Sequence, residues 1–135
     1  MRIDHVAIEC NKIEEMKEFY SKVFELKVSN KYENVKKNFI SYFLYFDDNI
    51  SIELMNSPKS KIDKGDNKSH FSIGVNSEEE VDKVVDKIRK YKKAKVTSEA
   101  RFSGLGDYVA CIEDIEGNYI EVIYNKRIFN NNHYI

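Results

Sequence analysis

The sequence predicts an α+β protein made of two βαβββ modules, each running strand, helix and three further strands. Three observations lead to this prediction. The motif x-His-apolar-small-Ile-x-x-Asn occurs at residues 4–11 and again at 69–76. A helical pattern of apolar residues follows each copy directly. Each half then closes with a turn and a strand that contains Ile-Glu and two apolar residues, at 47–56 and 115–125. Such an internal repeat indicates a duplicated structural unit.

Strand alternation decides which side chains of the two motifs share a face of the sheet. In each motif the larger apolar residues fall on one face, which suits packing against a helix. The other face combines a histidine with small neighbours, which leaves room for a pocket. The first motif divides into Val6 and Ile8 against His5, Ala7 and Glu9, and the second into Phe71, Ile73 and Val75 against His70, Ser72 and Gly74.

Two helices are predicted from apolar residues spaced three and four positions apart, at residues 13–24 and 81–91. A polar residue followed by a glutamate three positions later has the spacing of a capping box, which predicts where a helix begins. This spacing occurs before each helix, in Asn11 with Glu14 and in Ser77 with Glu80.

Each half has room for two more strands between its helix and its closing strand. Residues 39–46 are rich in aromatic and β-branched residues, and 108–112 form a shorter apolar run. Residues 28–32 and 96–100 are weaker strand candidates. In the second half, residues 104–108 (Gly-Leu-Gly-Asp-Tyr) connect the last two of these candidate strands. They fit either a substrate lid or a plain turn, because glycine permits unusual backbone angles.

The chain of 135 residues has the length of one domain. We expect a single domain over residues 1–135, with module 1 at 1–57 and module 2 at 69–125. The segment between the modules, residues 58–68, holds the single proline and is expected to be an exposed linker. The tail, residues 126–135, contains three consecutive asparagines and is expected to be poorly ordered.

Composition and charge exclude several classes of protein. Lysine and arginine (22) balance aspartate and glutamate (23), so charge gives no argument for a nucleic-acid or membrane partner. No apolar stretch approaches the ~18 residues of a membrane span, and the first residues do not resemble a signal peptide, so we expect a cytoplasmic protein. Cys10 and Cys111 lack zinc-type spacing. We expect both to be small buried hydrophobic residues, with a disulfide or a catalytic thiol as alternatives.

Two glutamates occupy equivalent positions of the repeat and indicate a metal site. Glu53 and Glu121 each lie mid-strand between large apolar residues, where a carboxylate is costly unless it is paired or coordinated. With His5 and His70 they form a set of two imidazoles and two carboxylates, which suits one divalent ion such as Ni²⁺, Zn²⁺, Co²⁺, Mn²⁺ or Fe²⁺. The absence of cysteine ligands argues against a structural zinc site. The alternative is that the histidines satisfy hydrogen bonds and the glutamates pair with lysines.

These residues resemble a known family, the vicinal oxygen chelate superfamily of glyoxalases, bleomycin-resistance proteins and extradiol dioxygenases. The resemblance extends over residues 1–125. Residues 114–121 (Asp-Ile-Glu-Gly-Asn-Tyr-Ile-Glu) are similar to the family's D-P-x-G-N-x-I-E element, with Ile115 in place of the proline. It also rests on Ile-Asp-His-Val-Ala-Ile at 3–8, Phe-Tyr at 19–20 and Ser-His-Phe-Ser-Ile at 69–73.

The resemblance implies two βαβββ modules that form an open, barrel-like cup of mixed sheet around one metal ion. It also implies a homodimer, as in many members, often with ligands drawn from both subunits. The identity of the ligands separates the branches. Fosfomycin-modifying enzymes and extradiol dioxygenases use two histidines and one glutamate, methylmalonyl-CoA epimerases have glutamine at the position of Glu53, and bleomycin-binding proteins lack the set. The complete set His5, Glu53, His70 and Glu121 is most similar to that of glyoxalase I, the lactoylglutathione lyase.

Glyoxalase chemistry isomerises the hemithioacetal of a 2-oxoaldehyde and a thiol, a reaction that moves a proton between adjacent carbons. A divalent ion that binds both vicinal oxygens stabilises the enediolate, and a neighbouring carboxylate serves as base. The resemblance implies that Glu121 is the principal base and that Glu53 is a ligand and a possible second base. Relatives that use glutathione place an arginine four residues after the first histidine. Glu9 occupies that position and would repel a glutathione carboxylate.

Two other functions remain open from the sequence. One is a fosfomycin-type resistance transferase or hydrolase that opens an epoxide at the same metal. The other is a non-catalytic drug-binding protein, whose aromatic cleft would include Phe39, Tyr42 and Tyr108.

Overall fold

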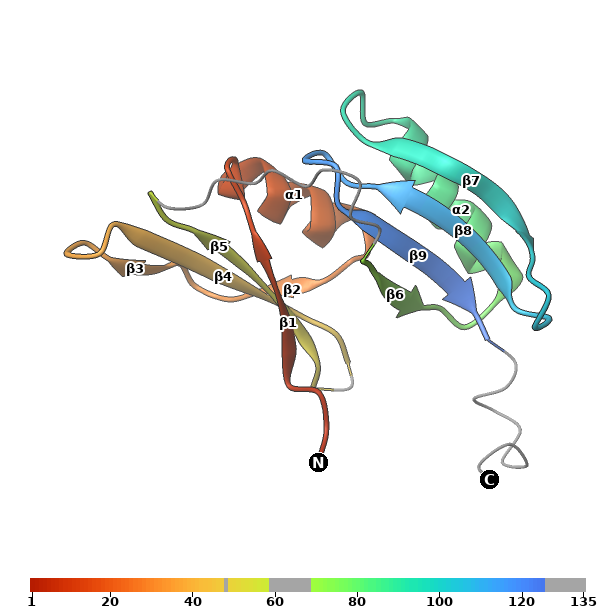
Figure 1. Cartoon of the computed structure of the whole chain (residues 1–135), viewed down its shortest axis with the longest axis horizontal. Coiled ribbons are helices and arrows are strands. Elements are labelled where there is room, and N and C mark those ends of the chain that lie inside the picture. The colour runs from red at the N-terminus through yellow and green to blue at the C-terminus, as the bar shows by residue number, and fades with distance from the viewer. Residues whose placement is uncertain (48, 59–68, 126–135) are drawn as a thin grey trace. The chain divides into compact units, whose positions relative to one another are not determined.

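A computed structural model describes residues 1–47, 49–58 and 69–125 of the chain. It divides into two compact units, Met1–Asn67 and Lys68–Ile135, called unit 1 and unit 2 below. Figure 1 labels their helices and strands. The predicted tail and nearly all of the predicted linker lie outside the described residues.

Unit 1 contains one helix and a mixed sheet in the strand order β1-β5-β4-β2, with the short β3 also paired to β4. Its first strand runs parallel to its last, and the other neighbours are antiparallel. The elements are β1 (His5–Glu9), α1 (Ile13–Val23), β2 (Lys27–Val28), β3 (Tyr32–Asn34), β4 (Phe39–Tyr45) and β5 (Ser51–Asn56).

Unit 2 repeats this plan in a four-stranded sheet of order β6-β9-β8-β7. Again the first strand is parallel to the last and the remaining pairs are antiparallel. The elements are β6 (Phe71–Gly74), α2 (Glu78–Arg89), β7 (Lys95–Phe102), β8 (Tyr108–Glu113) and β9 (Tyr119–Tyr124). The predicted α+β class and the order strand, helix and three strands are therefore confirmed in unit 2.

Unit 1 departs from the prediction at residues 28–32, which do not form one strand. Two short strands, β2 and β3, occupy this region instead. The backbone N–H of Phe43 donates to the hydroxyl of Ser29 at 2.9 Å, while the N–H of Ser29 donates to the carbonyl of Phe43. The Ser29 side chain thus takes the place of a backbone acceptor, which interrupts the regular ladder of backbone hydrogen bonds with β4.

Each helix covers one face of its sheet with an apolar stripe. In α1 the buried side chains include Met16, Phe19 and Tyr20, and those of the sheet include Leu44 and Leu54. In unit 2 the corresponding core is made by Val81, Val85, Ile88, Ala110, Ile112, Ile120 and Val122. The predicted alternation is confirmed in β1 and β6, because Ile8 and Ile73 are buried while the residues on either side of them are exposed.

One of the two predicted capping boxes is correct. Ser77 precedes α2 and accepts a hydrogen bond from the N–H of Glu80 at 3.2 Å, and the Glu80 carboxylate accepts from the N–H of Asn76. The prediction for Asn11 and Glu14 is wrong, because α1 begins after Lys12, whose side chain makes no capping hydrogen bond. The carboxylate of Glu14 accepts hydrogen bonds from two other side chains.

A tyrosine hydroxyl ties the helix to the sheet in each unit. Tyr42 of β4 donates to Glu14 of α1 at 2.7 Å, and Lys17 both bonds Glu14 and lies 4.5 Å from the centre of the Tyr42 ring. These hydrogen bonds, first that of Lys17 and then that of Tyr42, hold the pKa of Glu14 below its ordinary value. In unit 2 Tyr108 donates to Asp82 of α2 at 2.9 Å, and this bond raises the pKa of the tyrosine.

A matching backbone hydrogen bond precedes the closing strand of both units. In each turn a backbone N–H donates to the carbonyl four residues later, from Phe46 to Ile50 and from Asp114 to Asn118. The fourth residue of each turn has a positive φ, 60° at Asn49 and 83° at Gly117. The second turn is reinforced by the buried carboxylate of Asp114, which accepts from the N–H groups of Glu116 and Asn118 and from the Asn118 side chain. The equal turns place Glu53 and Glu121 at the same position of their strands.

No helix in the described parts of the chain is long and apolar enough to cross a membrane.

Candidate functional site

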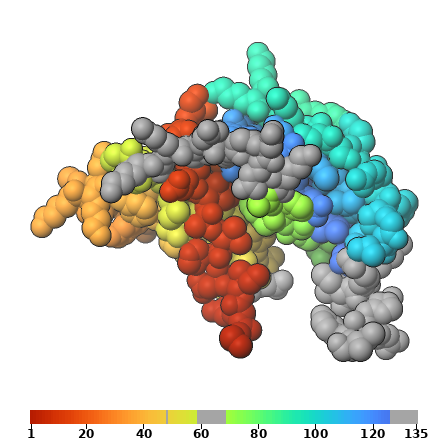
Figure 2. All heavy atoms as spheres, in the orientation of Figure 1, coloured from red at the N-terminus to blue at the C-terminus, as the bar shows by residue number. Residues whose placement is uncertain are grey.

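Unit 1 brings His5 and Glu53 together on the face of its sheet opposite α1, called the open face below. In the parallel pairing of β1 and β5, Ala7 lies beside Glu53, and His5 lies two residues earlier on the same face. The Nε2 atom of His5 is 3.3 Å from an Oε atom of Glu53. Only 15% of the Glu53 side chain is exposed, against 38% for His5. β1 lies at the surface in Figure 2, where its residues are red.

Asp4 supports the imidazole of His5 from its other side. Its carboxylate lies 2.9 Å from Nδ1 of His5, and this hydrogen bond holds the pKa of Asp4 below its ordinary value. Histidines that bind metals almost always donate their second ring N–H to a carboxylate, a carbonyl or a water. If Nδ1 carries the proton, Nε2 keeps its lone pair and points toward Glu53, which is the arrangement that a metal ligand requires.

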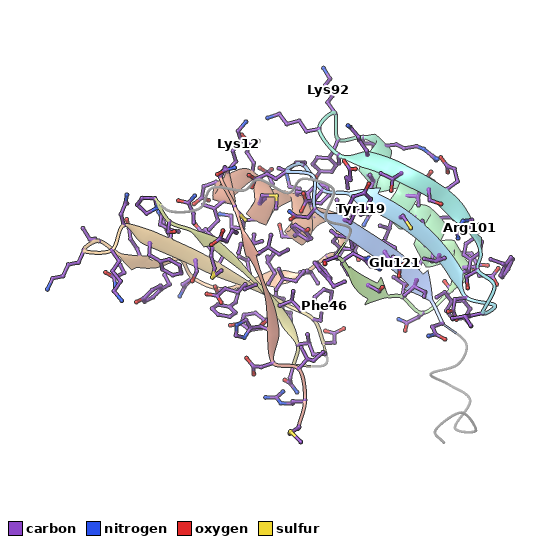
Figure 3. The ribbon with its side chains drawn as sticks, in the orientation of Figure 1. Lys12, Phe46, Lys92, Arg101, Tyr119 and Glu121 are labelled. Atoms are coloured by element: carbon purple, nitrogen blue, oxygen red, sulfur yellow. The ribbon has the colours of Figure 1, made fainter. Side chains whose placement is uncertain are left out.

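Unit 2 builds the equivalent pair from His70 and Glu121. His70 immediately precedes β6, and Glu121 lies in β9 beside Ser72. The Nε2 atom of His70 is 3.4 Å from Oε1 of Glu121. The hydroxyl of Ser72 donates to the other oxygen, Oε2, at 2.6 Å. Figure 3 labels Tyr119 and Glu121, alternate residues of β9 that share the open face of this sheet.

The neighbours of the two glutamates differ. Phe43 lies opposite Glu53 in the β4–β5 pairing, and its ring meets that of His5 edge-on with 5.7 Å between centroids. Cys111 occupies the corresponding position opposite Glu121. Burial, and then the charge of Glu121, raise the pKa of Cys111, so the thiol is protonated near neutral pH and is a weak ligand.

Neither cysteine forms a disulfide in the described structure, but only one is buried as predicted. Cys10 is fully buried, whereas Cys111 is partly exposed. The prediction for Cys111 is wrong because its position in β8 points to the open face, while its neighbours Ala110 and Ile112 point to the helix.

The open face of unit 1 carries an aromatic row that the sequence analysis largely missed. Of the three aromatics predicted to line a cleft, only Phe39 lies on this face. Tyr42 and Tyr108 do not, because each directs its hydroxyl to a helix. Strand alternation from Phe39 was the signal that could have found Phe43 and Tyr45, whereas Tyr32 is placed by the pairing of β3 with β4. The aromatic row consists of Tyr32, Phe39, Phe43 and Tyr45, with 6.1 Å between the rings of Tyr32 and Phe39 and 6.3 Å between those of Phe43 and Tyr45.

Residues 104–108 include the tight turn between β7 and β8. The N–H of Ser103 donates to the carbonyl of Asp107 at 2.8 Å, and the hydroxyl of Ser103 accepts from the N–H groups of Leu105 and Asp107. Gly106 has a φ of 84°, and Asp107 is buried. These bonds are those expected of the plain-turn alternative.

The four predicted ligands thus occur as two histidine–glutamate pairs, one in each unit. Within neither unit do the described residues gather three or more histidine, cysteine, aspartate or glutamate side chains in a position that could hold one metal ion. Each glutamate lies beside a histidine, and no ion pair with a lysine is found for either within the described parts of the chain. Each pair offers one nitrogen and at least one oxygen, a donor set that suits a divalent transition metal.

The sequence matches the model of the Glyoxalase/Bleomycin resistance protein/Dioxygenase superfamily over residues 2–122. The chain belongs to this superfamily. No curated protein matches the chain. The chain is also similar to many solved structures, and the three described below, each less than 25% identical to it, show the fold of the superfamily.

The trypanothione-dependent glyoxalase I of Leishmania major is 22% identical, with a TM-score of 0.76 over 96% of this chain and 90% of that one. A hypothetical protein of S. aureus, SA1046, is 21% identical, with a TM-score of 0.70 over 93% and 97%. A glyoxalase I mutant of Zea mays is 24% identical, with a TM-score of 0.77 over 92% of this chain. The chain spans only 44% of the maize protein.

Proposed function

We propose that the protein is a glyoxalase I-like metalloenzyme, a lyase that isomerises the hemithioacetal formed by a 2-oxoaldehyde and a thiol. In this proposal His5, Glu53, His70 and Glu121 hold one divalent cation, within one chain or between two chains of a homodimer. The observation that carries the proposal is the duplicated pair: in both units a histidine Nε2 lies within 3.4 Å of a glutamate oxygen. The hydrogen bond between Asp4 and Nδ1 of His5 adds the support typical of a metal-binding histidine.

The residues of the chain have distinct roles in this proposal. The cation, when bound, supplies positive charge that stabilises the enediolate form of the substrate. Glu121 accepts the proton from the substrate carbon and returns it to the adjacent carbon, and Glu53 serves as a ligand and second base. Glu9 lies on the open face of β1 and is exposed, so a thiol without a carboxylate at that point is preferred over glutathione.

The first experiment measures metal content and affinity. Purified protein incubated with Ni²⁺, Zn²⁺ or Co²⁺ is expected to retain about one ion per chain, measured by elemental analysis and titration calorimetry. Glu53→Gln and Glu121→Gln should each weaken binding at least tenfold, because loss even of a residue that only supports a ligand costs about that much. Glu33→Gln is the matched control, since Glu33 is exposed in β3 and should bind as wild type. A wild-type chain that retains no ion contradicts the proposal.

The second experiment identifies the reaction. The metal-loaded protein is assayed with methylglyoxal and a panel of thiols that includes glutathione and thiols without carboxylates. Isomerisation of the hemithioacetal is expected, and its loss in Glu121→Gln with the metal still bound would assign the base. Turnover of fosfomycin with the same thiols, in place of methylglyoxal, would instead establish the resistance enzyme.

The aromatic row favours one second candidate, a protein that binds an apolar small molecule without reaction. Tyr32 and Tyr45 are both exposed, 55% and 47%, on a face that a soluble ligand with a flat ring could cover. This candidate predicts ligand-induced changes in tyrosine fluorescence in protein stripped of metal. The absence of metal uptake together with such a change would favour it over the enzyme.

A further inference from the structure

We infer that Ser72 is a positioning residue for the metal centre, and that it presents a single oxygen of Glu121 to the cation. The inference rests on the proposed function, because it assigns a role to a residue beside one of the proposed ligands. Ser72 lies in β6 directly beside Glu121 of β9 in the parallel pairing. Its hydroxyl is therefore held against the carboxylate by the register of the sheet.

The two oxygens of Glu121 have different partners. Oε2 accepts the Ser72 hydroxyl at 2.6 Å, whereas Oε1 lies 3.4 Å from Nε2 of His70. A hydrogen bond from a hydroxyl to a carboxylate is among the stronger side-chain contacts. It fixes the torsion of the carboxylate group, so that Oε1 is the oxygen left for the cation beside His70. Ordering the ligand before the ion arrives lowers the entropic cost of binding.

The other unit lacks this support. The residue beside Glu53 in the β1–β5 pairing is Ala7, whose methyl group cannot donate a hydrogen bond. There the additional contact falls on the histidine instead, through Asp4. The residues beside the two glutamates therefore differ, because Glu121 has a hydroxyl donor next to it in the sheet and Glu53 has a methyl group.

The test compares Ser72→Thr with Ser72→Val in the full-length chain. These side chains have nearly the same shape and both favour a strand, so they differ chiefly in the hydroxyl. Co²⁺ affinity is measured by calorimetry, and the visible absorption of bound Co²⁺ reports how its ligands are arranged. We expect Ser72→Val to bind Co²⁺ about tenfold more weakly with an altered spectrum, and Ser72→Thr to bind within about twofold of wild type.

Ser98→Ala provides the control for loss of a hydroxyl elsewhere on the same face. Ser98 of β7 lies beside Cys111 rather than beside Glu121, so this variant should bind Co²⁺ as wild type. The thermal unfolding midpoint of each variant, measured without metal, separates an effect on the site from an effect on folding. Equal Co²⁺ affinity and equal spectra in the valine and threonine variants would overturn the inference while leaving the proposed metal centre intact. A wild-type protein that takes up no Co²⁺, Ni²⁺ or Zn²⁺ would overturn both.

Discussion

In our proposal, two side chains that do not bind the cation orient two side chains that do. Asp4 holds the ring of His5, and Ser72 holds the carboxylate of Glu121. Both come from the strand segments that carry the histidines, one residue before His5 and two after His70. The short motif around each histidine therefore encodes a ligand together with an orienting residue.

Replacing Asp4 with asparagine tests the support of His5. Asparagine keeps an oxygen that accepts the imidazole N–H but lacks the negative charge that makes Nε2 a stronger ligand. We expect Asp4→Asn to weaken metal binding about tenfold, and Asp4→Ala to weaken it further, as measured by calorimetry. An unchanged affinity in Asp4→Ala would show that the ring needs no such support.

Reversing the charge of Glu9 tests the choice of thiol. A carboxylate at this exposed position repels a carboxylate of glutathione, whereas arginine would bind it with paired hydrogen bonds. We expect Glu9→Arg to lower the KM for the glutathione hemithioacetal about tenfold with little change in kcat. The KM with an uncharged thiol should stay as it is in the wild type, which provides the control.

The two histidine–glutamate pairs could be predicted from sequence, because strand alternation fixes which face of the sheet each side chain occupies. His5 and Glu53, like His70 and Glu121, lie on one open face and come within hydrogen-bonding range of each other. The hydrogen bonds of Asp4 and Ser72 could not be predicted, because they depend on side-chain torsions and on strand register. The prediction that Tyr42 lines a cleft is wrong, because the aromatic composition of a segment does not tell which face of the strand each ring occupies.

At the scale of the elements, a tyrosine hydroxyl ties the helix to the sheet in each unit. Tyr42 is buried and donates to Glu14, which also accepts from Lys17. Glu14 thus stabilises unit 1 in its ionised form. The sequence assigned Glu14 to a capping box because the spacing fits, and the tertiary contact with Tyr42 overrides that local pattern.

Replacing Tyr42 with phenylalanine removes the hydrogen bond and keeps the buried ring. We expect Tyr42→Phe to lower the free energy of unfolding by about 1.5 kcal/mol at pH 7, measured by urea denaturation. Because the pKa of Glu14 is lowered in the folded state, its contribution is complete above the ordinary glutamate pKa of about 4.3 and is lost as the pH falls through the lower folded value. The difference between Tyr42→Phe and wild type should therefore shrink in acid. A difference that is constant with pH would contradict the role of the carboxylate.

The turn before β9 offers a matched pair of glycine substitutions. Gly117 has a φ of 83°, a left-handed conformation that strains any residue with a Cβ atom, whereas Gly104 lies outside this region. A Cβ at either position would meet no atom within 4 Å, so the backbone angle alone distinguishes them. We expect Gly117→Ala to destabilise the protein by about 1 kcal/mol and Gly104→Ala to change its stability by less than about 0.5 kcal/mol. Equal losses in the two variants would contradict this account.

The order of elements could be predicted because the repeat fixes the module and hydrophobic spacing fixes each helix and each long strand. The short strands of unit 1 and the first residue of α1 could not be predicted. The break between β2 and β3 depends on one hydroxyl, that of Ser29, which bonds the backbone of a strand distant in sequence. The start of α1 after Lys12 likewise has no side-chain cap from which the sequence could reveal it.

For the whole molecule, the proposed centre draws one donor pair from each of the two units. A ligand that binds only the folded state raises stability by mass action, by about 2.7 kcal/mol at a hundred times its Kd. We expect saturating Ni²⁺ or Co²⁺ to raise the thermal midpoint of the wild type by about 10 °C. At the same metal concentration a tenfold weaker affinity removes about half of this stabilisation, so Glu53→Gln should lose half or more of the increase, and so should Glu121→Gln, although the two residues belong to different units. A full increase in either variant would show that one pair binds the ion alone.

Each histidine belongs to the segment of an edge strand. Within the described part of each unit, β1 is paired with β5 alone and β6 with β9 alone. An edge strand is held by hydrogen bonds along one side, and it opens at a lower free energy than the rest of the sheet. Release of a bound ion would then follow the fraying of these edge strands, and its rate would be far less sensitive to denaturant than the rate of global unfolding.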